Sequence, residues 1–495
     1  MIMWTTAHST SSPASRFKVL LAGLGLTFAS FLAFAFPLPV LLFVAVVLGL
    51  FIAMKFPGCA LYLYAASLFL IEWPSLEGMK ISVPTLAGAL FLTAACLRRL
   101  RSPEEATRGS WIPFMIGIIS MFYLAAALLN ADWTFAHPRL TITYLALFAT
   151  TLAASYVLRN PGWAWRVSQI FCAGSAILSL LALYEVWTGQ YNMVGVFPGQ
   201  DERPYGLSDP NITAVMLVTL LPLPAAHFVC GRSTRTKILA VALMALSLVG
   251  IGMTASRGGV VGCVLTLGAI SLFVGFKQKP GSCGDRPHDR LFGSALRRIG
   301  LLAVLLCSVG FAAYVAPQNL WDRLSTVEQW SNPKKEVRLQ IWSYYLDRWR
   351  ESPWVGKGPG YADEREKYTE STPVQTLVEV GVLGFAAFVV LNALAFWEAL
   401  NASRRFALQG MTEMSALSGA LAASLIGFHS TAFFLTCATH KELWFLLGFA
   451  AALSYLSRSN QGARYCAVSA NSLQQTTPYT LLAREGSQLS NSPPP

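Results

Sequence analysis

Charged residues are scarce in this sequence. Lys, Arg, Asp and Glu make up 13% of its 495 residues, about half of the roughly 25% that is usual for a soluble protein. The strict alternation of apolar and polar residues that marks a membrane β-barrel strand is also absent. These two absences argue against a soluble globular protein and against a barrel.

Metal-binding and disulfide patterns are lacking as well. The nine cysteines are scattered, and they form neither a CxxC pair nor a Cys/His cluster. Several of them, including Cys172, Cys263 and Cys307, lie inside apolar segments, where cysteine behaves as a small apolar residue. The sequence therefore predicts neither a disulfide framework nor a metal site, and no cofactor is expected.

Long apolar blocks dominate what is present. Apolar residues make up 54% of the chain and the mean hydropathy is +0.50. The blocks are about 20 residues long, enough to cross ~30 Å of hydrocarbon as helix, and only helices then satisfy the backbone inside lipid. We predict an all-α polytopic membrane protein with about 12 to 14 transmembrane helices. The predicted spans are 18–35, 38–54, 59–72, 83–97, 112–130, 139–158, 166–187, 212–230, 236–253, 258–276, 299–315, 377–399, 415–435 and 442–457.

Basic residues alternate between the loops. The net charge of +12 lies mainly in every second loop, so it orients the helices and does not indicate a nucleic-acid partner. Positive residues in short loops mark the cytoplasmic side, which predicts that both termini are cytoplasmic. The predicted organisation is a cytoplasmic N-terminus (1–15), transmembrane helices (16–315), a long extracytoplasmic loop (316–376), further transmembrane helices (377–461) and a disordered cytoplasmic tail (462–495).

The long loop contains a predicted amphipathic helix over 337–349. Its apolar residues recur at three- and four-residue spacing, at Val337, Ile341, Tyr344, Tyr345 and Trp349. Breakers follow it, namely Pro353, Gly356, Gly358 and Gly360.

Three arginines fall on the predicted outer side: Arg203, Arg257 and Arg338. Each of them also has an interpretation without a ligand. Arg203 could be an ordinary loop residue, Arg257 an interfacial side chain that reaches water, and Arg338 part of a solvated face. Taken together, guanidinium groups suit phosphate oxygens, which they bind in pairs. Gly258 and Gly259 let a ligand approach the backbone and leave helix N–H groups for an oxyanion. We therefore predict a site for a lipid-linked diphosphate.

Four motifs carry a family resemblance over about 200–385. They are the segment from Arg203 to Asn211, the Ser-Arg-Gly-Gly turn at 256–259, the run from Arg338 to Gly360, and the Glu-x-Gly-x-x-Gly helix start at 379–384. Their order resembles the O-antigen ligase and O-antigen polymerase superfamily of bacterial envelope glycan enzymes. The resemblance implies the fold of the multi-span helical C-type glycosyltransferases and a place in the bacterial inner membrane.

The resemblance also implies an activity. Such enzymes move a glycan from an undecaprenyl-diphosphate carrier to an acceptor hydroxyl on a lipid, glycan or protein, with inversion and without a metal. Arg203 and Arg257 would hold the diphosphate, with Arg338, Gly258, Gly259 and Glu379 in support. Fixed positive charge would stabilise the departing diphosphate.

One position departs from the family pattern. The family usually has His-Asn nine residues before the motif's glutamate, whereas this chain has Glu370 and Ser371 there. Glu370 could act as the base if burial raised its pKa, and His440 or His137 are other candidates. Without a base, the chain would be a non-catalytic transporter or scaffold for lipid-linked glycans. A solute transporter is disfavoured, because acidic residues are rare within the spans.

Overall fold

The computed structural model describes residues 57–70, 82–101, 110–130, 136–189, 209–274, 310, 337–362 and 369–459. Within these ranges every regular element is a helix, and seven helices are long and apolar enough to cross a membrane. This confirms an all-α polytopic membrane protein. The predicted spans 18–35 and 38–54, nearly all of 299–315, and the tail 462–495 lie outside the described residues, so the total of 12 to 14 stays a prediction.

The first half of the bundle follows the predicted spans closely. Local sequence sets the helix ends: at the start of α7, Pro161 needs no N–H partner and the Asn160 side chain accepts a hydrogen bond from Trp163 N. At its other end Gly189 adopts φ 67° and stops the helix. The elements are α3 (Pro57–Ser67), η1 (Leu68–Leu70), α4 (Val83–Arg101), α5 (Ile112–Leu129), α6 (Ala136–Val157) and α7 (Pro161–Thr188).

The second half supplies the rest of the bundle. The predicted span 212–230 is divided into two helices at Pro222, because proline has no N–H to continue the ladder. The helix predicted over 337–349 is present as α15. The elements are α8 (Pro210–Leu220), α9 (Pro222–Cys230), α10 (Thr234–Met253), α11 (Arg257–Phe273), α15 (Val337–Arg350), α16 (Thr372–Leu408), α17 (Thr412–Ala432) and α18 (Lys441–Arg458).

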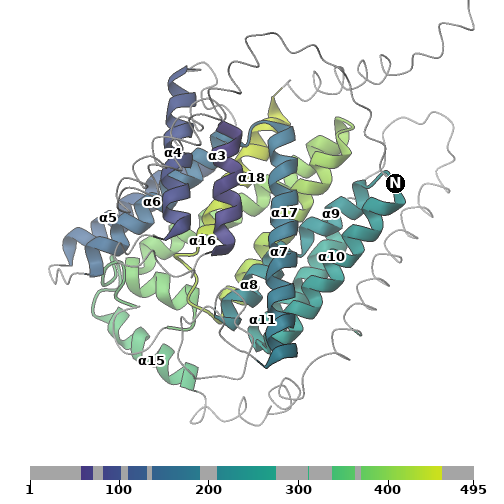
Figure 1. The fold of residues 1–495 in the computed structure, drawn as a ribbon. Coiled ribbons are helices and arrows are strands. Elements are labelled where there is room, and N and C mark those ends of the chain that lie inside the picture. Colours follow the sequence, from purple (N-terminus) through teal and green to yellow (C-terminus); the bar gives the residue numbers. More distant parts are fainter. Residues whose placement is uncertain are drawn as a thin grey trace, which may run out of the picture.

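Helix α17 packs on both α11 and α16 within the helical bundle of Figure 1. Sixteen of its 21 residues are buried, and many of these are alanine, serine or glycine. Small residues allow helices to approach closely: a Cβ on Gly262 of α11 would collide with Thr431, and one on Gly427 would collide with Thr266. The core is therefore built by backbone proximity as much as by large side chains.

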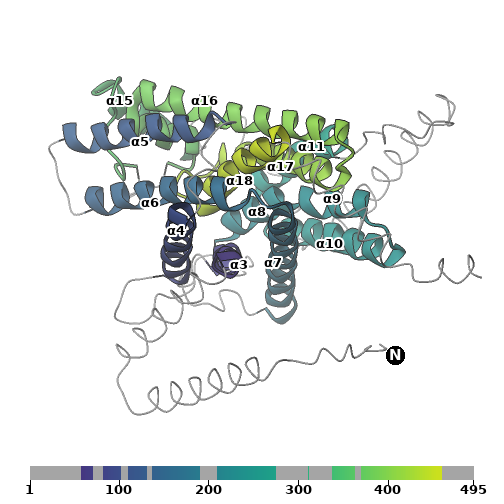
Figure 2. The ribbon, with the colours of Figure 1, turned by 90° about the horizontal axis from the view of Figure 1, so that it is seen from above.

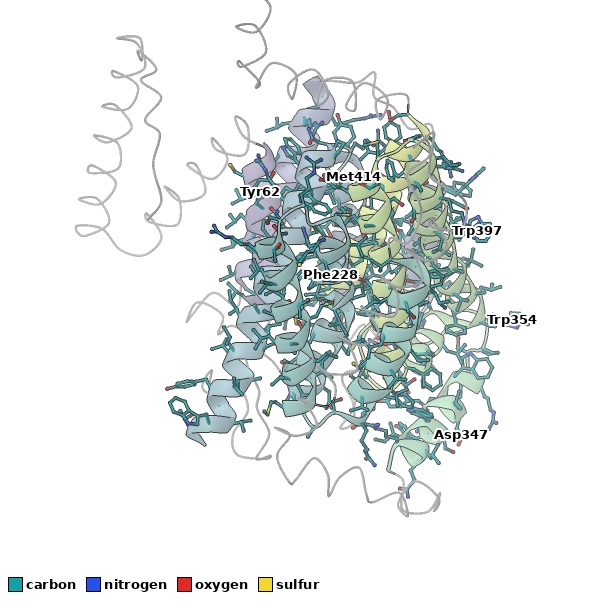
Figure 3. All side chains as sticks on the ribbon, turned by 90° about the vertical axis from the view of Figure 1, so that its right-hand side faces the viewer. Tyr62, Phe228, Asp347, Trp354, Trp397 and Met414 are labelled. Atoms are coloured by element: carbon teal, nitrogen blue, oxygen red, sulfur yellow. The ribbon has the colours of Figure 1, made fainter. Side chains whose placement is uncertain are left out.

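The two ends of the bundle differ in character. At one end Arg98 and Arg159 both lie over the Tyr156 ring, and Arg159 also lies 3.9 Å from the centre of the Tyr455 ring. At the other end lies α15, and Figure 3 shows its Asp347 far from Met414 at the start of α17. This arrangement agrees with the predicted grouping of basic loops; which end faces the cytoplasm stays a prediction.

Helix α16 is broken at Gly381, which has φ 67° and ψ −174°. The sequence placed the start of a helix at the 379–384 motif. The structure instead has helix on both sides of Gly381, beginning at Thr372, so the motif marks an interruption before the long segment 382–408. Figure 2 places this helix alongside both α15 and α5.

Candidate functional site

The first wall of the candidate site is the start of α11. Ala255 takes φ 49°, an uncommon conformation for alanine, and Ser256 then caps the helix by accepting a hydrogen bond from Gly259 N at 3.2 Å. Arg257 is the first helical residue. The Gly259 N–H is thus bonded within the cap, which differs from the expectation that it serves an oxyanion. Gly258 packs on Phe434 and Gly259 on Ala214, so helix packing alone accounts for both glycines.

The second wall is α15. Arg338 and Leu339 stand in its first turn, and Trp342 follows one turn later. The Trp342 indole donates a hydrogen bond to the Thr369 carbonyl at 3.0 Å. This contact fixes the indole against the segment that leads into α16.

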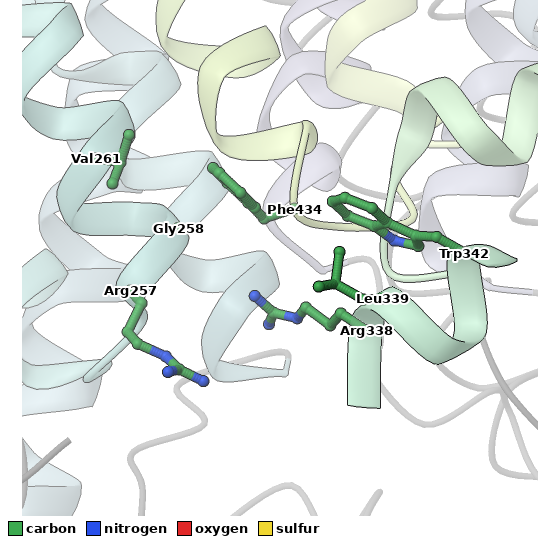
Figure 4. A pocket seen from close by; sticks show the side chains of 7 residues that line it. All are labelled: Arg257, Gly258, Val261, Arg338, Leu339, Trp342 and Phe434. Carbon is green, nitrogen blue, oxygen red and sulfur yellow. The ribbon is translucent and has the colours of Figure 1, made fainter. Parts of the chain in front are cut away.

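A pocket of about 230 Å³ lies between these walls, lined by Arg257, Gly258, Val261, Arg338, Leu339, Trp342 and Phe434. Two arginines far apart in the sequence therefore meet in one pocket. Figure 4 shows their guanidinium groups on one side, with Val261, Phe434 and Trp342 lining the other. The pocket suits a ligand that is anionic at one end and apolar at the other.

Phe434 was not predicted as a site residue. It reaches the pocket because the loop after α17 is tied to the start of α16: the Thr372 hydroxyl donates to the Leu435 carbonyl at 2.6 Å and accepts from Cys437 N at 2.8 Å. The neighbouring pair Phe433-Phe434 at the end of an apolar span was the available signal. Nothing in the sequence indicates that this span end meets α11.

Glu370 lies beside the pocket and is paired with Arg338. The Arg338 Nε is 2.5 Å from Glu370 Oε2, and the glutamate side chain is 42% exposed. The burial that the base hypothesis required is therefore not found in this conformation. Glu370 also has φ 46°, directly before Ser371, which caps α16.

The other predicted site residues lie elsewhere. Arg203 is outside the described residues, as is the side chain of His137. Glu379 is fully buried and accepts hydrogen bonds from Gly360 N and the Tyr144 hydroxyl, so it does not line the pocket. In the described parts of the chain, no three His, Cys, Asp or Glu side chains gather closely enough to bind a metal ion.

His440 is buried immediately before α18 and does not line the pocket. Its Nδ1 is 3.7 Å from Glu442 Oε2. Burial lowers the pKa of His440 to about 4, so the imidazole is neutral near pH 7 and this contact is not an ion pair there. Its position makes His440 a poorer base for a ligand in the pocket than Glu370.

Comparison with known proteins bears on this pocket directly. The family model of the O-antigen ligases matches residues 242–389, which include α11, α15 and the broken part of α16 and every pocket residue except Phe434. No curated protein matches the chain. The match supports glycan transfer of the ligase or polymerase type in general, and together with the apolar helices it supports a multi-pass protein of the bacterial inner membrane. Residues 242–389 thus match the O-antigen ligase domain, and this match supports the resemblance to the O-antigen ligase and polymerase superfamily.

Proposed function

We propose that the pocket between α11 and α15 binds the diphosphate of a polyprenyl-diphosphate-linked glycan, and that the protein transfers this glycan to an acceptor hydroxyl. The observation that carries the proposal is the meeting of Arg257 and Arg338 in one pocket with an apolar wall. Two guanidinium groups suit the oxygens of a diphosphate. The apolar wall formed by Val261, Trp342 and Phe434 suits the first units of a prenyl chain.

The proposed reaction is an inverting displacement at the anomeric carbon. The acceptor oxygen forms a bond to that carbon while the bond to the diphosphate oxygen breaks, and the diphosphate leaves with the electron pair. Arg257 and Arg338 stabilise the charge that grows on the leaving group, and Arg203 is proposed as a third such arginine. The Glu370 carboxylate takes the proton of the acceptor hydroxyl. In this scheme no metal is needed to neutralise the leaving group.

The ion pair between Arg338 and Glu370 connects binding to proton transfer. A carboxylate that is held by Arg338 is poorly placed to accept a proton from a sugar hydroxyl. A diphosphate oxygen arriving at Arg338 would displace the carboxylate, so that donor binding would release the base. The alternative is a non-catalytic transporter or scaffold for lipid-linked glycans, and the exposed, paired state of Glu370 is the observation that favours it.

Transfer from a defined donor separates these two functions. The protein would be placed in proteoliposomes with an undecaprenyl-diphosphate-linked glycan and with envelope lipids, glycans or proteins as acceptors, and release of undecaprenyl diphosphate would be followed. We expect Arg257→Ala and Arg338→Ala each to lower kcat/KM by about 100-fold, and Glu370→Ala to abolish transfer without weakening donor binding.

The matched control is Arg350→Ala. Arg350 lies on the same helix as Arg338, is 72% exposed and forms an ion pair with Asp347, so the control should transfer at the wild-type rate. A wild-type protein that binds the donor and transfers to none of the acceptors would establish the scaffold instead. Wild-type activity in Arg257→Ala would refute the diphosphate site.

A further inference from the structure

The loop after α15 is docked on the break in α16. Three backbone hydrogen bonds join them: Val382 N to the Pro353 carbonyl at 2.8 Å, Lys357 N to the Val378 carbonyl at 2.8 Å, and Gly358 N to the Glu379 carbonyl at 2.9 Å. A helix break leaves backbone groups without helical partners, and buried groups of this kind need others. The loop supplies them, so the break and the loop form one unit.

Two glycines make this contact possible. Gly381 has φ 67° and its α-carbon lies against the backbone of Trp354, while Gly356 has φ 80° and lies against the backbone of Glu379. A Cβ at either position would collide with backbone atoms, which cannot turn aside as a side chain can. The two chain segments therefore approach to a distance that only glycine permits.

The Glu379 side chain also binds this loop, from the buried side. It is 0% exposed, and its Oε1 accepts from Gly360 N at 3.1 Å while its Oε2 accepts from the Tyr144 hydroxyl at 2.8 Å. A buried carboxylate is costly without such donors and holds them strongly when it has them. Glu379 thus connects α16, the loop after α15 and α6 at one point.

Helix α15 is held to the same chain segment by three aromatic side chains on one face. Trp349 Nε1 donates to the Pro353 carbonyl at 3.1 Å, and the Tyr345 hydroxyl donates to the Ala362 carbonyl at 3.1 Å. Trp342, in the pocket, makes the bond to Thr369 already described. Because Pro353 and Ala362 lie in or next to the loop 353–360, a shift of this loop moves α15, which carries Arg338.

We propose that Glu379 is a positioning residue, which holds the loop 353–360 on the break in α16 and thereby places Arg338 in the same pocket as Arg257. The inference rests on the proposed function for the role of Arg338. Glu379 touches no substrate in this account and acts only through the loop and α15.

The chain offers a matched control for the test. Glu398 is a second buried carboxylate on α16, and its Oε1 accepts a hydrogen bond from Trp111 N at 3.0 Å, beyond the break and away from the pocket. Glu379→Gln and Glu398→Gln remove the same charge from the same helix. A general loss of stability would affect both variants, whereas a positioning role belongs to Glu379 alone.

Hydrogen exchange of the full-length protein tests, without any ligand, whether Glu379 holds the loop and α15 in place. In Glu379→Gln the amides of 337–362 should exchange roughly tenfold faster than in wild type, because a buried charged acceptor has been lost. In Glu398→Gln they should exchange as in wild type. Unchanged protection of 337–362 in Glu379→Gln would overturn the inference, whatever the protein's activity.

Binding of undecaprenyl diphosphate tests the consequence. Glu379→Gln should weaken binding roughly tenfold in the wild-type background and should have no further effect in Arg338→Ala, since residues that act through one another are not additive. Losses that multiply would show that Glu379 does not act through Arg338, and the inference would be wrong. A wild-type protein that binds no undecaprenyl diphosphate would refute the proposed function. It would leave the positioning role of Glu379 standing, because the hydrogen-exchange experiment tests that role without any ligand.

Discussion

Arg338 and Glu370 form an ion pair at the edge of the pocket, with Nε 2.5 Å from Oε2. The carboxylate occupies a place at the guanidinium that a phosphate oxygen would take in the proposed complex. Glu370 is held there with φ 46°, a conformation that costs a non-glycine residue about 1 kcal/mol or more. A phosphate oxygen of the donor can therefore replace the Glu370 carboxylate at Arg338, and this exchange should be visible in the affinity for the donor.

Glu370→Gln should bind the donor more tightly although it cannot act as a base. Removing the competing carboxylate frees Arg338, and a partly exposed ion pair of up to about 1 kcal/mol corresponds to a gain of up to roughly fivefold in affinity. Undecaprenyl diphosphate binding would be measured by titration, beside the rate of transfer. Asp347→Asn, which removes the carboxylate paired with Arg350 on the outer side of α15, is the control and should leave affinity unchanged. Weaker binding by Glu370→Gln would contradict the exchange of partners.

Sequence patterns anticipated the helices of this fold better than its tertiary contacts. Prolines, caps and apolar length act locally, so α15 and the start of α11 lie where the pattern placed them. Loop alternation, a long-range regularity that the membrane imposes, predicted that Arg257 and Arg338 lie on one side of the membrane; that both line one pocket is known only from the structure. Phe434 could not be predicted, because its position depends on a hydrogen bond between Thr372 and a distant loop.

The motif at 379–384 illustrates the same limit. Its glycines were interpreted as a helix start, whereas Gly381 is required by the backbone of Trp354, which belongs to another segment. Glu379 was placed among the supporting site residues on resemblance alone. Its hydrogen bonds to Gly360 and Tyr144 depend on three separate parts of the chain, and no local pattern contains that information.

Gly381→Ala should destabilise the protein strongly. The substitution combines a positive φ with a collision against backbone, and we expect a loss of about 2 kcal/mol or more in the free energy of unfolding. Gly268→Ala in α11 is the control, because a Cβ there meets nothing within 4 Å and alanine favours helix over glycine. Thermal unfolding in detergent would be compared for the two variants. Equal melting temperatures would show that the backbone of Trp354 does not pack closely against Gly381.

The stability of the protein should fall in mildly acidic solution, in part because of His440. Burial lowers the pKa of this histidine from 6.5 to about 4, so the unfolded chain binds its proton more readily than the folded chain does. The contribution is fully present above about pH 6.5 and is lost progressively as the pH falls toward 4. His440→Gln should show a smaller difference in melting temperature between pH 7.5 and pH 5 than wild type. A difference as large as in wild type would mean that His440 is protonated without penalty, for instance through Glu442, which lies 3.7 Å away.

The orientation of the bundle can be tested at its two ends with single cysteines in a cysteine-free background. Arg350 on α15 is 72% exposed, and Arg404 near the end of α16 is also exposed, at the opposite end of the bundle from α15. If α15 covers the outer face, a membrane-impermeant maleimide added to intact spheroplasts should label Arg350→Cys and should reach Arg404→Cys only after the membrane is opened. Each variant serves as the control for the other, since both side chains are accessible in the folded protein. The reverse pattern would place the pocket of Arg257 and Arg338 on the cytoplasmic side, where an acceptor of the outer envelope could not reach it.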